Sequence, residues 1–155
     1  MEDSINLKRI RTWMKDLADG RAGHEIEAST TKGIRVLKAQ KGFVLCDFTV
    51  HNGILDENGN WHVGAIATLV DVMGSLSSFS YNSFDHVTLD FSISYYSTAK
   101  LQEEVELEAK VAGKKFESTS VIVEVRKKNT KELVAMGKLW MTPSKGSAKS
   151  QTSKL

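Results

Sequence analysis

The pattern of apolar and polar residues predicts one long buried helix at residues 62–84, between two groups of strands. Apolar residues recur there at three- and four-residue spacing, and alanines and valines extend the apolar surface almost all the way round. A helix that is apolar on nearly every side is expected inside a domain. One polar stripe interrupts this surface, at Thr68, Asp71, Ser75 and Ser78.

The same patterning predicts the elements around this helix. An amphipathic helix at 4–19 is followed by six strands, at 33–40, 41–50, 87–96, 103–112, 115–127 and 132–142. The strand at 87–96 alternates most cleanly: Thr88 lies on its polar face, and its expected buried face carries Val87, Leu89, Phe91, Ile93 and Tyr95. Four consecutive antiparallel strands need a cover for their buried face. The order therefore predicts an α+β fold whose antiparallel sheet curls around the central helix.

Composition indicates one domain at residues 1–143 and a polar, lysine-rich tail at 144–155. A net charge of +2 gives no reason to expect nucleic acid as a partner, and no uninterrupted apolar run suggests a membrane span. The first residues lack the features of a secretory or transit signal. The single cysteine, Cys46, lies in an apolar strand pattern and is expected in the core.

The last three residues, Ser153, Lys154 and Leu155, spell the peroxisomal address that an import receptor reads. Average residue usage places this tripeptide at a chain end by chance roughly once in 2,000. The sequence therefore predicts a peroxisomal protein, unless the tail is an arbitrary polar extension.

Asp71 is the only charged residue between His62 and Asp85. Burying a lone carboxylate costs free energy unless it is hydrogen-bonded or shifts its pKa. Two interpretations follow. The helix reaches the surface along this edge, or the carboxylate is held in a cleft for chemistry.

The sequence of this helix and of the strands after it resembles that of a known protein family. A His-x-Gly step at 62–64, the run Ala-Thr-Leu-Val-Asp at 67–71 and the four strands that follow resemble the small hotdog-fold acyl-CoA thioesterases. The resemblance covers about residues 30–142. It implies a hotdog fold and hydrolysis of acyl-CoA to free acid and coenzyme A without a cofactor. It also implies a homodimer, commonly paired into a homotetramer, with active sites at the interface.

Helix geometry supports a site shared by two chains. The nine residues from His62 to Asp71 rotate the helix by ~900° and raise it by about 13.5 Å. Asp71 therefore points away from the helix start and lies well along the axis from it. Two helices related by a two-fold axis can bring Asp71 of one chain to the helix start of the other.

Five residues are expected to carry the chemistry. Asp71 would activate water or attack the thioester carbonyl itself, and the backbone N–H groups of Val63 and Gly64 would hold the oxyanion. The resemblance places Thr88 where the family has a water-positioning hydroxyl, although it is also an ordinary strand residue. His62 would orient the thioester or merely cap the helix. The family often has glycine at the position of Val63, so this side chain is expected to crowd the site.

Substrate-binding candidates lie in the loops and strand ends. The family carries an amide side chain near Asp56, with Asn58 and Asn60 close by, and Tyr95 lies near the end of the long strand. Cations for the coenzyme A phosphates are candidates at Lys100, Arg126, Lys127 and Lys128, unless these are solvated strand-end charges. No metal-ligand cluster is present in the sequence, so hydrolysis is expected to need no cofactor.

Two other functions stay open at this point. An aromatic acyl-CoA hydrolase, such as a dihydroxynaphthoyl-CoA thioesterase, shares the fold and compartment, although its helix acid is typically glutamate rather than aspartate. A hotdog dimer that binds acyl-CoA without hydrolysing it is the second alternative, favoured by Val63 and by the uncertain amide.

Overall fold

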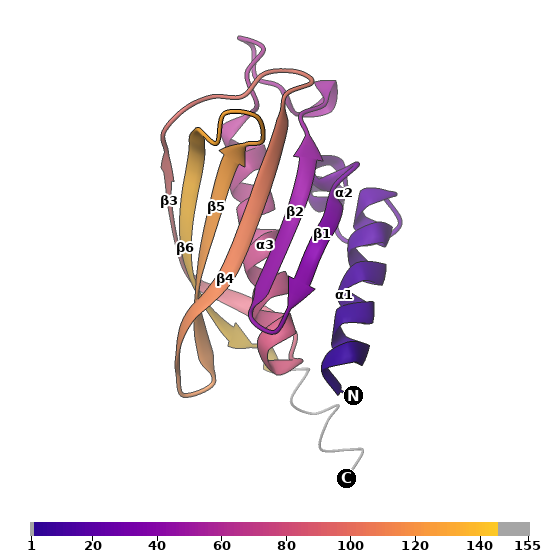
Figure 1. Cartoon of the computed structure of the whole chain (residues 1–155), viewed down its shortest axis with the longest axis vertical. Helices are drawn as coiled ribbons and strands as arrows, with labels where there is room; N and C mark the ends of the chain where they lie inside the picture. Colours follow the sequence, from indigo (N-terminus) through magenta and orange to yellow (C-terminus); the bar gives the residue numbers. More distant parts are fainter. Residues whose placement is uncertain (1, 146–155) are drawn as a thin grey trace.

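One antiparallel sheet of six strands wraps around a long helix in the computed structural model, which describes residues 2–145 (Figure 1). The helices are α1 (Glu2–Ala18), α2 (Glu25–Thr31), the 3-10 turn η1 (Asn52–Ile54) and α3 (Val63–Asn82). The strands are β1 (Arg35–Gln40), β2 (Phe43–Thr49), β3 (His86–Tyr95), β4 (Glu104–Lys115), β5 (Ser118–Lys127) and β6 (Leu133–Pro143). Their order across the sheet is β1-β2-β4-β5-β6-β3. The predicted α+β hotdog architecture is therefore confirmed.

The central helix α3 forms the middle of the core. Its apolar residues Ile66, Leu69, Met73 and Leu76 are at most 2% exposed. Gly74 brings the helix close to the sheet, because a Cβ atom there would lie 3.1 Å from the Leu139 side chain. By length and composition α3 also meets the criterion for a membrane span, but buried core helices meet it too, and most of α3 is buried.

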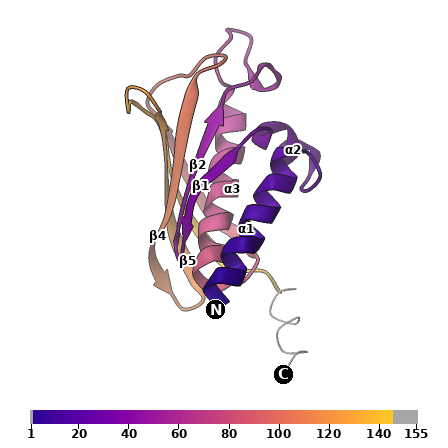
Figure 2. The same cartoon turned by 45° about the vertical axis from the view of Figure 1, so that its right-hand side comes forward.

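The N-terminal helix α1 lies on the same side of the sheet as α3 and packs against it (Figure 2). It buries Ile10, Met14 and Leu17. The expected helix at 4–19 is thus confirmed, although it begins at Glu2 and ends at Ala18. The side chain of Asn6 donates a hydrogen bond to Ser83 just after α3, which ties the start of α1 to the end of the central helix.

The short helix α2 was not predicted. Its sequence EIEASTT has no apolar periodicity, because the residues that it buries, Thr30 and Thr31, are polar. The available signal was its N-terminus, where the Glu27 side chain accepts a hydrogen bond from the His24 backbone N–H.

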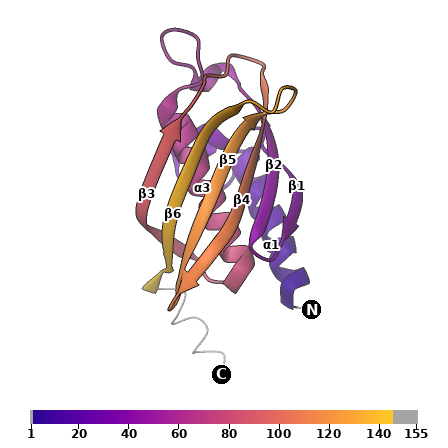
Figure 3. The same cartoon turned by 60° about the vertical axis from the view of Figure 1, so that its left-hand side comes forward.

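Strand β3 corrects the expected alternation. It forms one edge of the sheet (Figure 3), and its supposedly buried face is largely exposed in the single chain: Val87 is 49%, Leu89 63% and Tyr95 43% exposed. The pairing with β6 shifts between Thr88 and Asp90, so Leu89 is an extra, unpaired residue. This bulge turns Thr88 to the face that Phe91 also occupies, toward α3 rather than away from it.

Of two further expectations, the one for Ser78 was wrong and the one for Cys46 is confirmed. Ser78 does not continue the exposed polar stripe of α3, because it is buried against the sheet and its hydroxyl forms a 2.9 Å hydrogen bond with Thr119. Cys46 is buried in the core as expected, and burial raises the pKa of its thiol to about 12. The thiol is therefore a packing group.

Candidate active site

The start of α3 is held by two side chains. The Nδ1 atom of His62 accepts a hydrogen bond from the Gly64 N–H at 2.9 Å, so His62 caps the helix. Because Nδ1 is the acceptor, a neutral ring carries its proton on Nε2 and presents that N–H outward. The Tyr95 hydroxyl donates to the Val63 carbonyl at 2.9 Å, and burial raises the pKa of Tyr95, which keeps it a neutral donor.

These contacts distinguish the two backbone N–H groups that are expected to hold the oxyanion, those of Val63 and Gly64. The Gly64 N–H is already used by His62, whereas the Val63 N–H has no acceptor within residues 2–145. As the first residue of the helix, Val63 cannot find an acceptor in a preceding turn. Its side chain is 54% exposed in the single chain, and the expected crowding of the site by Val63 stays a prediction.

Asp71 lies in the middle of α3, on the side that faces the edge strand β3. The Thr88 hydroxyl donates a hydrogen bond to the Asp71 Oδ1 atom at 2.6 Å, and both residues are half-buried. The bond fixes one carboxylate oxygen and leaves the Thr88 hydroxyl oxygen able to accept a hydrogen bond from a water molecule. The pairing exists because the β3 bulge turns Thr88 toward the helix.

The loop before α3 uses Asp56 for its own structure. Its Oδ1 atom accepts from the backbone N–H groups of Asn58 at 2.8 Å and Asn60 at 2.9 Å. Asp56 is therefore an acceptor engaged in a turn and supplies no donor for a carbonyl. A bridge between Asn60 and Lys100 places the two loops side by side.

The candidate phosphate-binding cations are mostly engaged elsewhere. Ion pairs join Arg126 to Glu124, Lys127 to Glu103 and Glu132, and Lys128 to the buried Asp47. Burial alone would raise the pKa of Asp47, but hydrogen bonds from Arg35 and Lys128 outweigh it and the pKa is lowered. Among these four candidates, Lys100 alone has no ion pair in the described part of the chain, and its contact with a phosphate stays a prediction.

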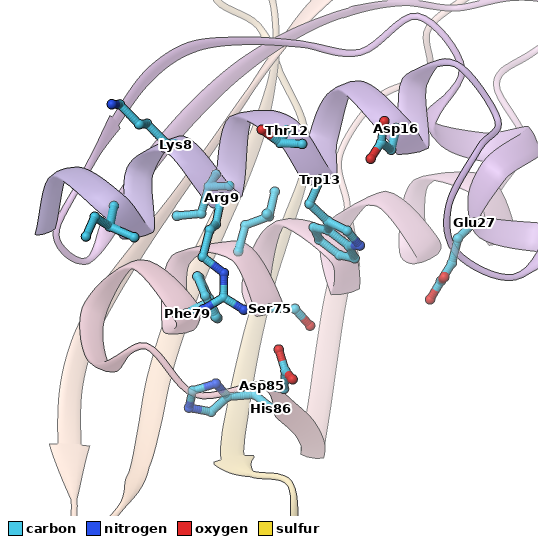
Figure 4. A pocket seen from close by; sticks show the side chains of 13 residues that line it. Lys8, Arg9, Thr12, Trp13, Asp16, Glu27, Ser75, Phe79, Asp85 and His86 are labelled. Carbon is cyan, nitrogen blue, oxygen red and sulfur yellow. The ribbon is translucent and has the colours of Figure 1, made fainter. Parts of the chain in front are cut away.

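A cavity of about 690 Å³ lies beside this site, between α1, the second half of α3 and the start of β3 (Figure 4). Ser75, one helical turn beyond Asp71, lines it together with Trp13 and Phe79. Sequence reasoning missed this cavity, because one wall comes from α1, about sixty residues earlier in the chain. No group of three or more His, Cys, Asp or Glu suited to a metal ion occurs among residues 2–145.

The sheet, its central helix and the capped helix start together define a thioesterase of the hotdog class. Comparison with known proteins agrees. Residues 58–134 match the sequence model of the thioesterase superfamily. The chain is also 32% identical over 108 residues to human acyl-coenzyme A thioesterase 13, an alignment that spans 68% of this chain and 76% of that protein. The chain therefore belongs to the thioesterase superfamily, and the prediction of a thioesterase enzyme is confirmed.

Solved structures support the same fold. Zebra fish thioesterase superfamily member 2 superimposes with a TM-score of 0.80 at 23% identity, covering 89% of this chain and 98% of that one. A Streptococcus mutans protein bound to acetyl CoA superimposes with a TM-score of 0.68 at 28% identity, covering 72% and 89%. These comparisons do not test which residues form the site, so the assigned roles stay predictions.

Proposed function

We propose that this protein hydrolyses acyl-CoA thioesters to a free acid and coenzyme A in the peroxisome. The observation that carries the proposal is the 2.6 Å hydrogen bond from Thr88 that fixes the Asp71 carboxylate on a mostly apolar helix. Two relatives support the substrate class: the human protein is named an acyl-coenzyme A thioesterase, and the Streptococcus mutans structure contains acetyl CoA.

In this reaction Asp71 acts as the general base. It takes one proton from a water molecule whose other O–H group donates a hydrogen bond to the Thr88 hydroxyl oxygen. The water oxygen then bonds to the thioester carbonyl carbon. The negative charge that develops on the carbonyl oxygen is stabilised by the Val63 N–H at the positive end of a helix. The C–S bond then breaks, and the proton held by Asp71 passes to the departing thiolate.

A direct test measures thiol release from a panel of acyl-CoAs. The panel contains straight-chain acyl groups of several lengths and one aromatic acyl group. Wild-type protein is expected to release coenzyme A from at least one of them. Binding of acyl-CoA without release of thiol from any member would instead support a non-catalytic binding protein.

The proposal places each site between two chains. Within one chain, Asp71 lies more than two helical turns from His62, and about 13.5 Å of helix rise separates them. The edge strand β3 carries Thr88 and exposes Leu89 and Phe91, 63% and 36% respectively, as expected of a surface that pairs with a second copy. We expect a dimer as the active unit, and a homotetramer as its further assembly.

Subunit mixing tests this shared site. Asp71→Ala chains and Val63→Pro chains are each expected to be nearly inactive. Mixing them should restore activity, because one of the two sites in each mixed dimer then has an intact Asp71 and an intact helix start. Mixtures whose subunits demonstrably exchange, yet which recover no activity, would place the whole site within one chain.

The peroxisomal part rests on Ser153, Lys154 and Leu155, which lie outside the described residues. Deleting these three residues should move the protein from peroxisomes to the cytosol, because a receptor reads them as a peptide. The purified truncated protein should keep wild-type turnover. Fluorescence microscopy of tagged full-length and truncated chains measures the first effect, and a truncated chain that stays in peroxisomes would contradict the address.

A further inference from the structure

The turn at residues 56–60, just before α3, projects from one end of the molecule. A hydrogen bond from the Asp56 N–H to the Asn60 carbonyl closes it at 2.7 Å. A bridge between Leu55 and Trp61 extends it into a short hairpin. Its tip lies beyond the start of α3 (Figure 1), and there the Glu57 side chain is exposed and forms no ion pair within residues 2–145. The turn is therefore a preformed projection with an uncompensated negative charge.

The cavity between α1 and α3 carries the opposite charge at one end. Lys8 and Arg9 line it there, and neither forms an ion pair within residues 2–145. The Arg9 side chain points from α1 toward Phe79 on α3 (Figure 4), and its guanidinium carbon lies 5.2 Å from the centre of that ring. The ring holds the cation by cation–π attraction while solvent still reaches it. An anionic group that enters the cavity at this end meets a cation already in position.

The other titratable groups of the lining do not neutralise this end of the cavity. They are Asp16, Glu27, Asp85 and His86. Asp16 pairs with Arg21 at 3.2 Å and lies about two helical turns beyond Arg9, and Glu27 caps the start of α2. No ion pair in the described part of the chain joins Asp85 to Lys8 or Arg9. Burial lowers the pKa of His86, so its ring is neutral at pH 7.

The two-fold arrangement proposed above brings this turn to the cavity of the second chain. Because it sets Asp71 of each chain at the helix start of the other, the two α3 helices run antiparallel. Residues before the start of one helix therefore lie level with residues beyond Asp71 on the other. Ser75 and Phe79, which line the cavity, lie about 6 Å and 12 Å beyond Asp71 along α3. The tip of the turn precedes the helix start by roughly three extended residues, about 10 Å, and is thus level with the cavity.

The cavity also adjoins the surface through which the two chains are expected to pair. The start of β3, the exposed edge strand, contributes His86 to its lining. Its α1 wall lies outside residues 58–134, the part of the chain that matches the family model. We propose that the turn at 56–60 of each chain docks in the cavity between α1 and α3 of its partner, where Glu57 pairs with the partner's Arg9.

This inference rests on the shared site of the proposed function. It gives α1 a role in that site, because the docked turn leads directly into His62 and Val63. Holding the turn against α1 of the second chain positions this helix start opposite the partner's Asp71. Glu57 and Arg9 are therefore positioning residues, which act on the reaction through the backbone that carries the expected oxyanion donor.

Charge reversal in separate chains tests this contact, which a two-fold dimer contains twice. Dimers of Arg9→Glu chains alone, or of Glu57→Arg chains alone, place like charges together at both contacts, whereas a mixed dimer places opposite charges at both. Like charges that face each other across an interface weaken association. The two variants, one with a mass tag, are co-expressed in equal amounts, and native mass spectrometry counts the dimers. Random pairing gives about half mixed dimers, and we expect about nine tenths, the result of tenfold weaker homodimers.

The matched control combines Arg9→Glu with Glu117→Arg. Glu117 is an exposed acid in the turn between β4 and β5, outside the cavity lining, and it has no ion pair within residues 2–145. These two variants should pair at random, because the reversed charges do not meet. Circular dichroism and thermal unfolding check that every chain is folded.

The outcomes separate the docking from the proposed hydrolysis. Random pairing of folded Arg9→Glu and Glu57→Arg chains would overturn the docking, and a raised KM for acyl-CoA in Arg9→Glu would then assign the cavity to the substrate. Biased pairing supports the docking, and the mixed dimers should release thiol from acyl-CoA faster than either variant alone. Biased pairing without thiol release, in wild-type protein as well, would refute the hydrolysis and leave the docking intact.

Discussion

Replacing Asp71 by asparagine is expected to lower the turnover of acyl-CoA at least about 100-fold, the scale of a lost general base. The amide can still accept the hydrogen bond that Thr88 donates at 2.6 Å, so the local packing should persist. It cannot take a proton from water at neutral pH. Stopped-time assays of thiol release give the turnover, and circular dichroism and thermal unfolding check that the fold is kept.

A matched control lies on the neighbouring strand. Asp90→Asn also removes one carboxylate, but the β3 bulge turns Asp90 toward the opposite face of the sheet, where it pairs with Trp140. Asp90→Asn should therefore keep turnover close to wild type. An Asp71→Asn protein with wild-type turnover would remove this carboxylate from the mechanism.

An isotope experiment separates the two chemical roles of Asp71. In a single turnover in ¹⁸O-labelled water, a general base directs the label only into the released acid. A nucleophilic Asp71 would first form an anhydride, and water attack at its aspartyl carbon would place the label in the protein. Mass spectrometry of the peptide that contains Asp71 distinguishes the two results.

The core of the fold could be predicted because periodicity reports burial directly. The helix α3 and its apolar residues followed from three- and four-residue spacing. The β3 bulge could not be predicted from the sequence. The unpaired residue Leu89 leaves the alternation of apolar and polar residues intact, yet it places Thr88 on the opposite face of the sheet from the one expected.

The candidate site also contains residues that could be predicted from the sequence and contacts that could not. Asp71 stood out because a charged residue conflicts with an apolar helix, and His62 and Val63 because they belong to the His-x-Gly step at the helix start. The role of Asp56 as a turn acceptor and the ion pairs of Arg126, Lys127 and Lys128 depend on partners that sequence spacing does not reveal. The exposed face of β3 was called buried for a related reason. Alternation shows that a strand has an apolar face but does not show which chain covers it.

Replacing Val63 by proline should lower turnover about 100- to 1,000-fold, the effect of losing one oxyanion donor. The change deletes the one N–H at the helix start that lacks an acceptor within residues 2–145. The backbone already suits proline. Val63 is the first residue of α3, where proline is favoured, and His62 before it has φ −63° and ψ 130°, the extended conformation that a residue preceding proline prefers.

The rest of the helix start should survive this substitution. Proline keeps the carbonyl that accepts from Tyr95, and the Gly64 N–H that donates to His62 is untouched. Val63→Gly is the matched control, because it removes the same side chain but keeps the N–H. It should retain hydrolysis at a stability cost of about 1 kcal/mol.

The informative quantity is the ratio of turnover between Val63→Gly and Val63→Pro, measured on proteins with comparable thermal unfolding. A ratio of about 100 or more assigns the oxyanion to this N–H, since the two variants differ at that donor while both lack the valine side chain. Equal turnover would exclude it. The Gly64 N–H, released from His62 when substrate binds, or an amide of Asn58 or Asn60 would then have to hold the charge, and His62→Ala, which frees the Gly64 N–H, would raise rather than lower turnover.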